Sequence, residues 1–196
     1  MAIEYISNES VNNGGTVTIP ANTTIAVAYV FRNVSAITTP ALTGTPMSVA
    51  ANSSDMVGIY YVNSPVAGTY TLSNMNAAFC RFLYLKGTND IRAGALALNT
   101  ATNPLSTTIA SSIDDFLLLI GARVDGANYF TIASITVDGA AINYLDNYYR
   151  GYKQSSGDSP VIGMAFGGAP YTLYYCVVSV KSLIASDQST FMTMIV

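Results

Sequence analysis

The side chains that could do chemistry are few, because the 196-residue sequence contains no His and only eleven Asp and Glu. Most of these carboxylates lie beside Gly, Asn or Ser in predicted turns, where Asx turns and hydration account for them. Asp114 and Asp115 are the only adjacent pair, directly before an apolar run. They could cap the start of that strand or contribute, with loop carbonyls, to a Ca²⁺ site. Because no DxDxDG spacing occurs, we expect no bound metal.

Nucleophilic catalysis lacks its usual partners in this sequence. Without His, the chain cannot supply a Ser-His-Asp or Cys-His arrangement, a His metal site or an imidazole proton shuttle. No Gly-rich loop follows a strand and opens a helix, so there is no phosphate-cradling motif. No pair of carboxylates is marked as a glycosidase pair. We therefore expect a protein that is not an enzyme and has no cofactor.

The two cysteines, Cys80 and Cys176, both lie in predicted strands. Buried free thiols are favoured, because free Cys packs as a small hydrophobic side chain. A disulfide stays open as the alternative, since it requires Cα atoms within about 7 Å, which a sequence does not reveal.

One short aromatic segment, Tyr148–Lys153, could form a binding platform. Aromatic rings beside cations suit a sugar ring or a protein partner, so Tyr148, Tyr149, Arg150 and Tyr152 are candidate interface residues. A strand with Tyr on both faces, one set of them buried, explains the same segment and is the favoured interpretation.

The elements around these residues follow a strand period. Short apolar or alternating runs bounded by Gly, Pro, Asn and Asp recur along the chain, and no amphipathic helical stripe appears. Residues 91–112 form an expected connector with one or two strands, at 93–98 and 106–110. Its many Ala residues leave a helix open as the alternative, although no amphipathic stripe supports one. This spacing predicts an all-β antiparallel sandwich or jelly roll in one domain, 1–196. The runs are residues 16–20, 24–31, 41–49, 56–62, 68–73, 77–85, 115–124, 134–143, 148–152, 161–166 and 171–183.

The two halves of the chain resemble one another. Residues 42–47, with Gly44, align with residues 137–142, with Gly139, at an offset of 139 − 44 = 95. The Cys80 and Cys176 strands align at an offset of 176 − 80 = 96, which would place the two cysteines at equivalent positions. We therefore predict half-repeats at about 16–90 and 106–183, as two four- or five-stranded units that cover each other's apolar face. A loose likeness between any two β-rich halves is the alternative.

The composition indicates a surface that is buried in a protein assembly. Only 10% of the residues are charged, against about 25% in an ordinary soluble domain, and there are 14 Tyr. Interfaces are depleted in charge and enriched in aromatic residues. A net charge of −3 with eight scattered cations disfavours nucleic acid. No apolar run approaches 18 residues, which disfavours a membrane partner, and the N-terminus lacks a signal-peptide pattern.

The last residues of the sequence are apolar. Residues 184–196 are expected to form a C-terminal arm or strand that pairs or docks on a neighbour, because a free apolar tail is a liability. Phe191, Met192, Met194 and Ile195 are its candidate interface residues.

The order of strands resembles a known class of proteins. The runs TIAVAYVFRN (24–33), MVGIYYVNSPVAGTYTLS (56–73), CRFLYLKG (80–87) and YYCVVSVKSL (174–183) are similar to small β-sandwich virion structural proteins of tailed bacteriophages. The resemblance covers roughly residues 16–183. It implies a capsid decoration (cement) protein or a fibre subunit, made in the host cytoplasm and placed on the capsid surface or tail. Its partners would be the major capsid protein or other virion proteins and further copies of itself, with a trimer favoured.

Two other functions remain open at this point. A carbohydrate- or receptor-binding β-sandwich of a phage tail or head fibre would use the loop tyrosines. A surface-layer or fimbrial subunit would accept a terminal strand from a neighbour. The leading expectation is a non-enzymatic virion structural protein that stabilises the coat lattice.

Overall fold

The architecture comes from a computed structural model of the whole chain. The structure describes residues 3–31, 38–53, 56–76, 79–92, 96–125, 128–130, 134–145, 150–165 and 172–182. Every regular element in these ranges is a β-strand, which confirms the all-β prediction. No helix long and apolar enough to cross a bilayer occurs among the described residues.

The strands divide into two halves along the chain. The first half comprises β1 (Glu4–Val11), β2 (Thr16–Ile19), β3 (Ile25–Phe31), β4 (Ala41–Leu42), β5 (Thr45–Pro46), β6 (Ser48–Ser53), β7 (Val57–Asn63), β8 (Gly68–Ser73) and β9 (Phe79–Lys86). The second half comprises β10 (Thr88–Ile91), β11 (Leu96–Thr100), β12 (Leu105–Thr108), β13 (Phe116–Asp125), β14 (Asn128–Phe130), β15 (Ser134–Val137), β16 (Ala140–Ala141), β17 (Asn143–Tyr144), β18 (Arg150–Gln154), β19 (Val161–Ala165) and β20 (Thr172–Ser182).

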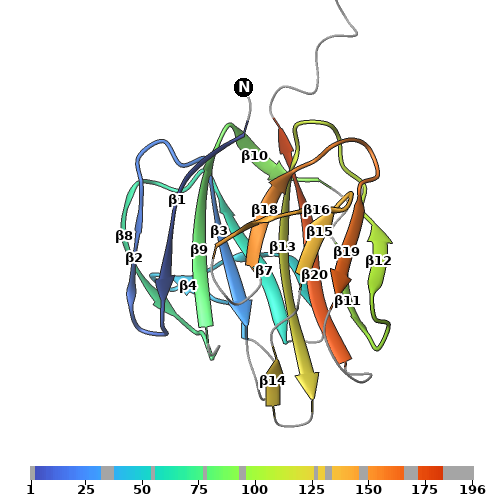
Figure 1. Cartoon of the computed structure of the whole chain (residues 1–196). Helices are drawn as coiled ribbons and strands as arrows, with labels where there is room; N and C mark the ends of the chain where they lie inside the picture. The colour runs from blue at the N-terminus through green and yellow to red at the C-terminus, as the bar shows by residue number, and fades with distance from the viewer. Residues whose placement is uncertain are drawn as a thin grey trace, which may run out of the picture.

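These strands build four antiparallel sheets stacked as layers. The outer sheet of the first half has the order β2-β8-β4-β5, and its inner sheet has the order β1-β9-β3-β7-β6. The inner sheet of the second half has the order β10-β20-β13-β18-β17, with β11 also on β20 and β14 on β13. The outer sheet of the second half has the order β12-β19-β15-β16. Figure 1 shows the layers following one another from left to right, with β2 and β8 on one side and β12 on the other.

The two halves share one strand order. The outer sheets of the two halves correspond in the order of strands along the chain and in hydrogen-bonded neighbours. The strands β2, β8, β4 and β5 match β12, β19, β15 and β16, respectively. In the inner sheets, β9, β3, β7 and β6 match β20, β13, β18 and β17, while β1 matches the β10–β11 edge. The second half therefore repeats the topology of the first.

Two tight hairpins lie at the equivalent place in each half. Thr43 and Gly44 connect Leu42 to its partner Thr45 with φ of 46° and 83°. Asp138 and Gly139 connect Val137 to its partner Ala140 with φ of 49° and 76°. Two positive φ angles in a two-residue loop define a type I′ turn, whose twist suits a hairpin. The aligned glycines 44 and 139 thus serve the same turn, as their shared offset of 95 requires.

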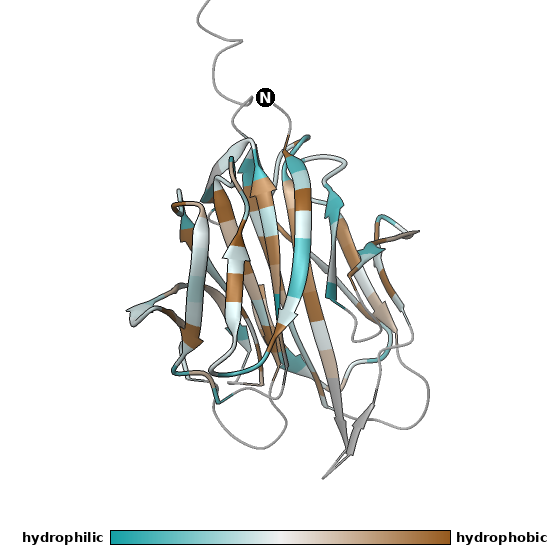
Figure 2. Ribbon diagram, turned by 90° about the vertical axis from the view of Figure 1, so that its left-hand side faces the viewer, coloured by the Kyte–Doolittle hydropathy of each residue, from teal (hydrophilic) through white to brown (hydrophobic). Residues whose placement is uncertain are grey.

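Three apolar cores fill the spaces between the layers. Tyr60, Phe82 and Tyr84 belong to the core of the first half, and Leu117, Leu119 and Tyr175 to that of the second. The third core lies between the two inner sheets. Because side chains alternate across a strand, the inner strands β3, β9, β13 and β20 carry apolar residues on both faces. Figure 2 shows hydrophobic residues recurring along many of the strands.

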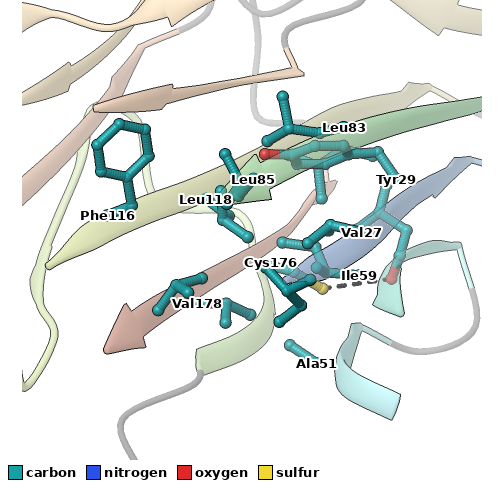
Figure 3. Close-up of a cluster of buried hydrophobic side chains, with 14 of the residues drawn as sticks. Val27, Tyr29, Ala51, Ile59, Leu83, Leu85, Phe116, Leu118, Cys176 and Val178 are labelled. Carbon is teal, nitrogen blue, oxygen red and sulfur yellow. Dashed lines mark hydrogen bonds between the residues drawn. The ribbon is translucent and has the colours of Figure 1, made fainter. Parts of the chain in front are cut away.

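The core between the inner sheets joins the two halves. It includes Val27 and Tyr29 from β3, Leu83 and Leu85 from β9, Phe116, Leu118 and Ile120 from β13, and Cys176, Val178 and Val180 from β20. Figure 3 shows many of these side chains converging from both sheets. Fully burying one such aliphatic side chain stabilises the fold by about 1.5–3 kcal/mol. Each half would expose this face without the other.

The structure corrects one sequence alignment. Leu83 and Leu85 face the shared core, and so do Val178 and Val180, which requires an odd offset; the offset of the hairpins, 178 − 83 = 95, meets this requirement. The predicted offset of 96 for the cysteine strands is therefore wrong by one residue. A one-residue shift moves every side chain to the opposite face. Cys80 accordingly lies in the core of the first half, and Cys176 in the core between the halves.

In its described residues, the connector between the halves contains two strands, where one or two were expected. They are β11 and β12, at Leu96–Thr100 and Leu105–Thr108 rather than at 93–98 and 106–110. Weak periodicity in an Ala-, Thr- and Ser-rich segment leaves strand boundaries poorly defined in the sequence.

Candidate functional site

An aromatic stack lies at the seam between the halves. The ring of Tyr152 in β18 stacks on Tyr5 of β1 with a centroid distance of 5.3 Å and an interplanar angle of 13°. Its other neighbour is Phe116 of β13, at 5.4 Å and 11°. Offset-stacked pairs contribute about 0.5–1.5 kcal/mol each beyond their buried area. Burial first, and then Tyr5, raise the pKa of Tyr152. Tyr152 is thus held inside the chain's own packing.

The other predicted platform residues are not seen to form an exposed binding surface in the described part of the chain. Arg150 is only 2% exposed, so in the single chain it offers no surface to a partner. Tyr148 and Tyr149 lie outside the described residues. Of the residues that the sequence grouped as one platform, Arg150 is therefore buried and Tyr152 is a half-buried member of the aromatic stack. The predicted arm residues Phe191, Met192, Met194 and Ile195 also lie outside the described residues.

Hydrogen bonds reinforce the seam. The hydroxyl of Tyr29 in β3 donates to the carbonyl oxygen of Gly151 in β18 at 2.9 Å. The thiol of Cys176 in β20 donates to the carbonyl oxygen of Val57 at 3.3 Å, the dashed line of Figure 3. The Arg81 guanidinium donates to the carbonyl oxygen of Leu145 at 3.1 Å. These bonds fix the relative position of the two inner sheets, which an apolar core alone does not specify.

Asp115 forms the densest polar cluster of the described structure. Its side chain is fully buried, and Arg92 binds it through two guanidinium nitrogens, with the Nη2–Oδ1 distance at 3.2 Å. Oδ1 also accepts from the backbone N–H of Ser182 at 3.0 Å. Oδ2 accepts from the backbone N–H of Ser112 at 2.9 Å and from the hydroxyl of Ser179 at 3.0 Å. One carboxylate thus connects the start of β13, the end of β20 and the segment after β10.

The electrostatics of this cluster favour the ionised carboxylate. Burial alone would raise the pKa of Asp115, but the hydrogen bonds from Arg92, Ser182, Ser112 and Ser179 outweigh burial and hold the pKa below its usual value. The neighbouring Asp114 accepts from the side-chain amide of Gln154 at 2.8 Å. Five donors saturate the two oxygens of Asp115, which leaves no ligand for a cation. The proposed capping role of Asp115 therefore fits the structure, and the Ca²⁺ role does not.

Glu9 links the two sheets of the first half. One oxygen of its carboxylate accepts from the backbone N–H of Thr18 in the edge strand β2 at 2.9 Å. The same oxygen accepts from the hydroxyl of Tyr84, whose ring is buried in the core below. Burial, followed by the hydrogen bond and the charge of Glu9, raises the pKa of Tyr84. The outward N–H of β2 is thereby capped by a charged side chain.

Both cysteines are buried free thiols, so the predicted disulfide alternative is wrong. Burial raises the pKa of Cys80 to about 12, and the nearby charge of Arg150 lowers it by less. Burial likewise raises the pKa of Cys176, against a smaller lowering by a hydrogen bond from the backbone of Ser53. Because the thiolate is the reactive form, neither side chain is poised as a nucleophile.

The described residues hold no group of three or more His, Cys, Asp or Glu that could bind a metal ion. The polar clusters found here are structural: every carboxylate named above is engaged by donors of the same chain. Sequence reasoning missed the partner of Asp115, because Arg92 lies 23 residues away in a connector without periodicity. It also missed Glu9, which no motif marks. No protein-family model matches the sequence, and neither a curated protein nor a solved structure matches it.

Proposed function

We propose that this chain is a non-enzymatic structural protein of a virion, and that its role is to decorate and stabilise a coat lattice. The observation that carries the proposal is the strand order, which occurs twice. In each half, the strands divide between two facing antiparallel sheets, and the order of neighbours is the same in both halves. Jelly rolls are the architecture of many viral coat proteins and lectins. The resemblance to virion proteins of tailed bacteriophages agrees with this assignment.

The exposed strand positions support an assembly role. Many of them carry small uncharged residues where a free monomer usually presents Lys and Glu. Interfaces are depleted in charge in the same way. A surface of this kind is suited to contact with coat subunits. Examples are Thr16, Thr18, Ser48, Thr69, Thr71, Ser106, Thr108, Ala140 and Ala141.

The internal construction suits a mechanical load. The two halves share an apolar core, and the bonds of Tyr29, Cys176 and Arg81 also cross the seam. Separating the halves would expose both inner sheets to water. A decoration protein that links neighbouring coat subunits needs such resistance to being pulled apart.

The carbohydrate- or receptor-binding alternative has weaker support. It depends on exposed tyrosines at 148–152, and Tyr152 is engaged by Tyr5 and Phe116 instead. Lectins also use jelly rolls, so a glycan array distinguishes the two functions. A specific glycan ligand would favour this alternative.

The experiment that tests the proposal is immunogold labelling of particles purified from cultures that produce this chain. Antibody raised against the purified protein should label the outer surface of the particles, and capsids should be labelled more than tails. The chain should also remain with the particles through a density gradient. Particles that lack the chain, together with a monodisperse monomer of no particle affinity, would overturn the proposal.

A further inference from the structure

The edges of the four sheets are the natural places for contact between chains. An edge strand presents unpaired N–H and C=O groups, and folded proteins usually blunt such edges with bulges, Pro, charges or caps. Here β1 has a bulge between Tyr5 and Ser7, and β6 has one between Val49 and Ala51. The strand β5 ends at Pro46. The edges of β1 and β6 are therefore poor templates for an added strand, and β5 is short.

Side chains cap several other edges. Glu9 accepts from the N–H of Thr18 in β2, and Lys153 donates to the carbonyl oxygen of Ala141 in β16 at 2.9 Å. The hydroxyl of Ser53 donates to the carbonyl oxygen of Leu98 in β11. Each cap occupies a backbone group that an incoming strand would need.

The edge strand β12 carries none of these devices. Its four residues pair with β19 in continuous register, from Leu105 opposite Met164 to Thr108 opposite Val161. It contains no charge and no Pro, and no described side chain reaches its outer backbone groups. Figure 1 places β12 at the outer margin of the fourth layer. The residues Ser106 and Thr108 on this strand are exposed.

The equivalent edge strand of the first half, β2, differs from β12 in how its edge is closed. β2 and β12 occupy the same position in the repeated topology, and both have exposed Thr or Ser residues. Only β2 has a carboxylate over its edge, supplied by Glu9. The repeated architecture therefore has one closed and one open copy of the same edge.

A segment of this chain has the chemistry to fill that edge. The last six residues, Phe191–Val196, are uncharged and contain no Pro or Gly, which is the composition of a β-pairing segment. The strand β20 ends at Ser182, and the backbone N–H of Ser182 donates to Asp115. Asp115 lies between the end of β12 and the start of β13. The eight residues 183–190 can span at most roughly 26–29 Å. Figure 1 shows that β12 and β20 both run toward the same end of the fold, so the arm leaves the sheets at the end where β12 finishes.

We propose that Phe191–Val196 of a second copy adds to β12 as a fifth strand of the outer sheet, so that neighbouring chains are linked by exchanged arms. This inference rests on the proposed function, which supplies the reason for pairing between copies. Main-chain hydrogen bonds to β12 provide affinity, as in other cases of strand addition. The arm's own copy of β12 is the competing site.

Site-directed crosslinking tests the pairing. One chain carries Ser106→Cys, and a second chain of different tag length carries a single Cys at position 192, 193, 194 or 195. The mixture is treated with a mild oxidant, and the native thiols do not interfere because they are buried. We expect a disulfide between the two chains at alternate arm positions only, because side chains of a strand alternate between faces.

The matched control is Thr18→Cys in β2, which should give no crosslink to the arm because Glu9 closes that edge. Absence of any crosslink to position 106, equal yields at 106 and 18, or equal yields at all four arm positions would each overturn the proposal. A chain that carries both cysteines and crosslinks only within itself, independent of dilution, would assign the edge to the chain's own arm and also overturn it.

A second pair of variants keeps the test independent of disulfide geometry. Ser106→Lys with Thr108→Lys should abolish self-association measured by light scattering, whereas Thr16→Lys with Thr18→Lys should leave it unchanged. Self-association that survives the first pair would contradict the proposal. If the arm exchanges as described but the chain is absent from particles, the virion function fails and the docking stands. Particle binding without arm exchange gives the reverse result.

Discussion

Replacing Asp115 by Asn removes a buried charge while keeping the size of the side chain. In the native structure this carboxylate accepts from Arg92, Ser112, Ser179 and Ser182, and its side chain has no exposed surface. Breaking a buried ion pair from one side costs about 3–5 kcal/mol. The amide NH₂ of Asn also faces donors, and each buried donor left unpaired costs about 1–3 kcal/mol. Since Arg92 is partly exposed, water recovers part of its solvation, and we expect a total near the lower figure, about 3 kcal/mol.

Urea unfolding followed by circular dichroism measures this loss. Asp114→Asn is the matched control, because Asp114 is adjacent and accepts an exposed hydrogen bond from the side-chain amide of Gln154. It should change the free energy of unfolding by no more than about 0.5 kcal/mol. For a chain of this size, the loss in Asp115→Asn corresponds to a fall in Tm of roughly 6–12 °C. If the two variants unfold within about 1 kcal/mol of each other, the assignment of Asp115 as the main polar anchor is refuted.

The same carboxylate predicts a direction for the pH dependence. The folded-state pKa of Asp115 lies below its unfolded value, so its contribution is fully present above the unfolded pKa of about 3.9. That contribution is lost as the pH falls through the folded pKa. Wild type should therefore lose more stability than Asp115→Asn between pH 5 and the acid limit. Parallel pH profiles of the two proteins would contradict this reasoning.

Three further predictions concern the repeats, the seam and the thiols. Gly44→Ala and Gly139→Ala should each destabilise the fold by about 1–2 kcal/mol in urea unfolding, because Ala is strained at positive φ. The control is Gly157→Ala, which should be near neutral because Gly157 lies in open space without positive φ. A large difference between the two hairpin variants would argue against their equivalence. Tyr29→Phe should cost about 1–3 kcal/mol, because the Gly151 carbonyl loses a buried donor, and a value near zero in urea unfolding would contradict the seam bond. Iodoacetamide at pH 8 should leave Cys80 and Cys176 unmodified in the folded protein and alkylate both in urea, as read by mass spectrometry; rapid alkylation before unfolding would contradict their burial.

Much of the fold could be predicted from local sequence patterns. Alternation and apolar runs indicated an all-β chain, and the Gly-centred hairpins at 44 and 139 marked equivalent turns, because a type I′ turn restricts the residues it accepts. The alignment of Cys80 with Cys176 failed because both strands carry apolar residues on both faces. Such strands show no alternation, so their sequences align equally well when one is shifted by one residue. Only packing decides which face of such a strand meets which core.

The polar anchors were harder to foresee. Asp115 stood out only as one of an adjacent pair, and its partner Arg92 comes from a distant connector. For the segment at 148–152, the favoured interpretation of a strand with one set of side chains buried agrees with Arg150 and Tyr152 in β18. Arg150 is buried, and the half-buried Tyr152 packs against Tyr5 and Phe116, so neither side chain forms the exposed platform that the sequence also allowed.

The most direct test of the central claim is a cryo-electron microscopy map of particles from cultures that produce this chain. The account predicts density on the particle surface that fits the four-layer fold, with a connection at the outer margin of β12 between neighbouring copies. A map whose surface has no density for this fold, from particles that mass spectrometry shows to lack the chain, would contradict the account.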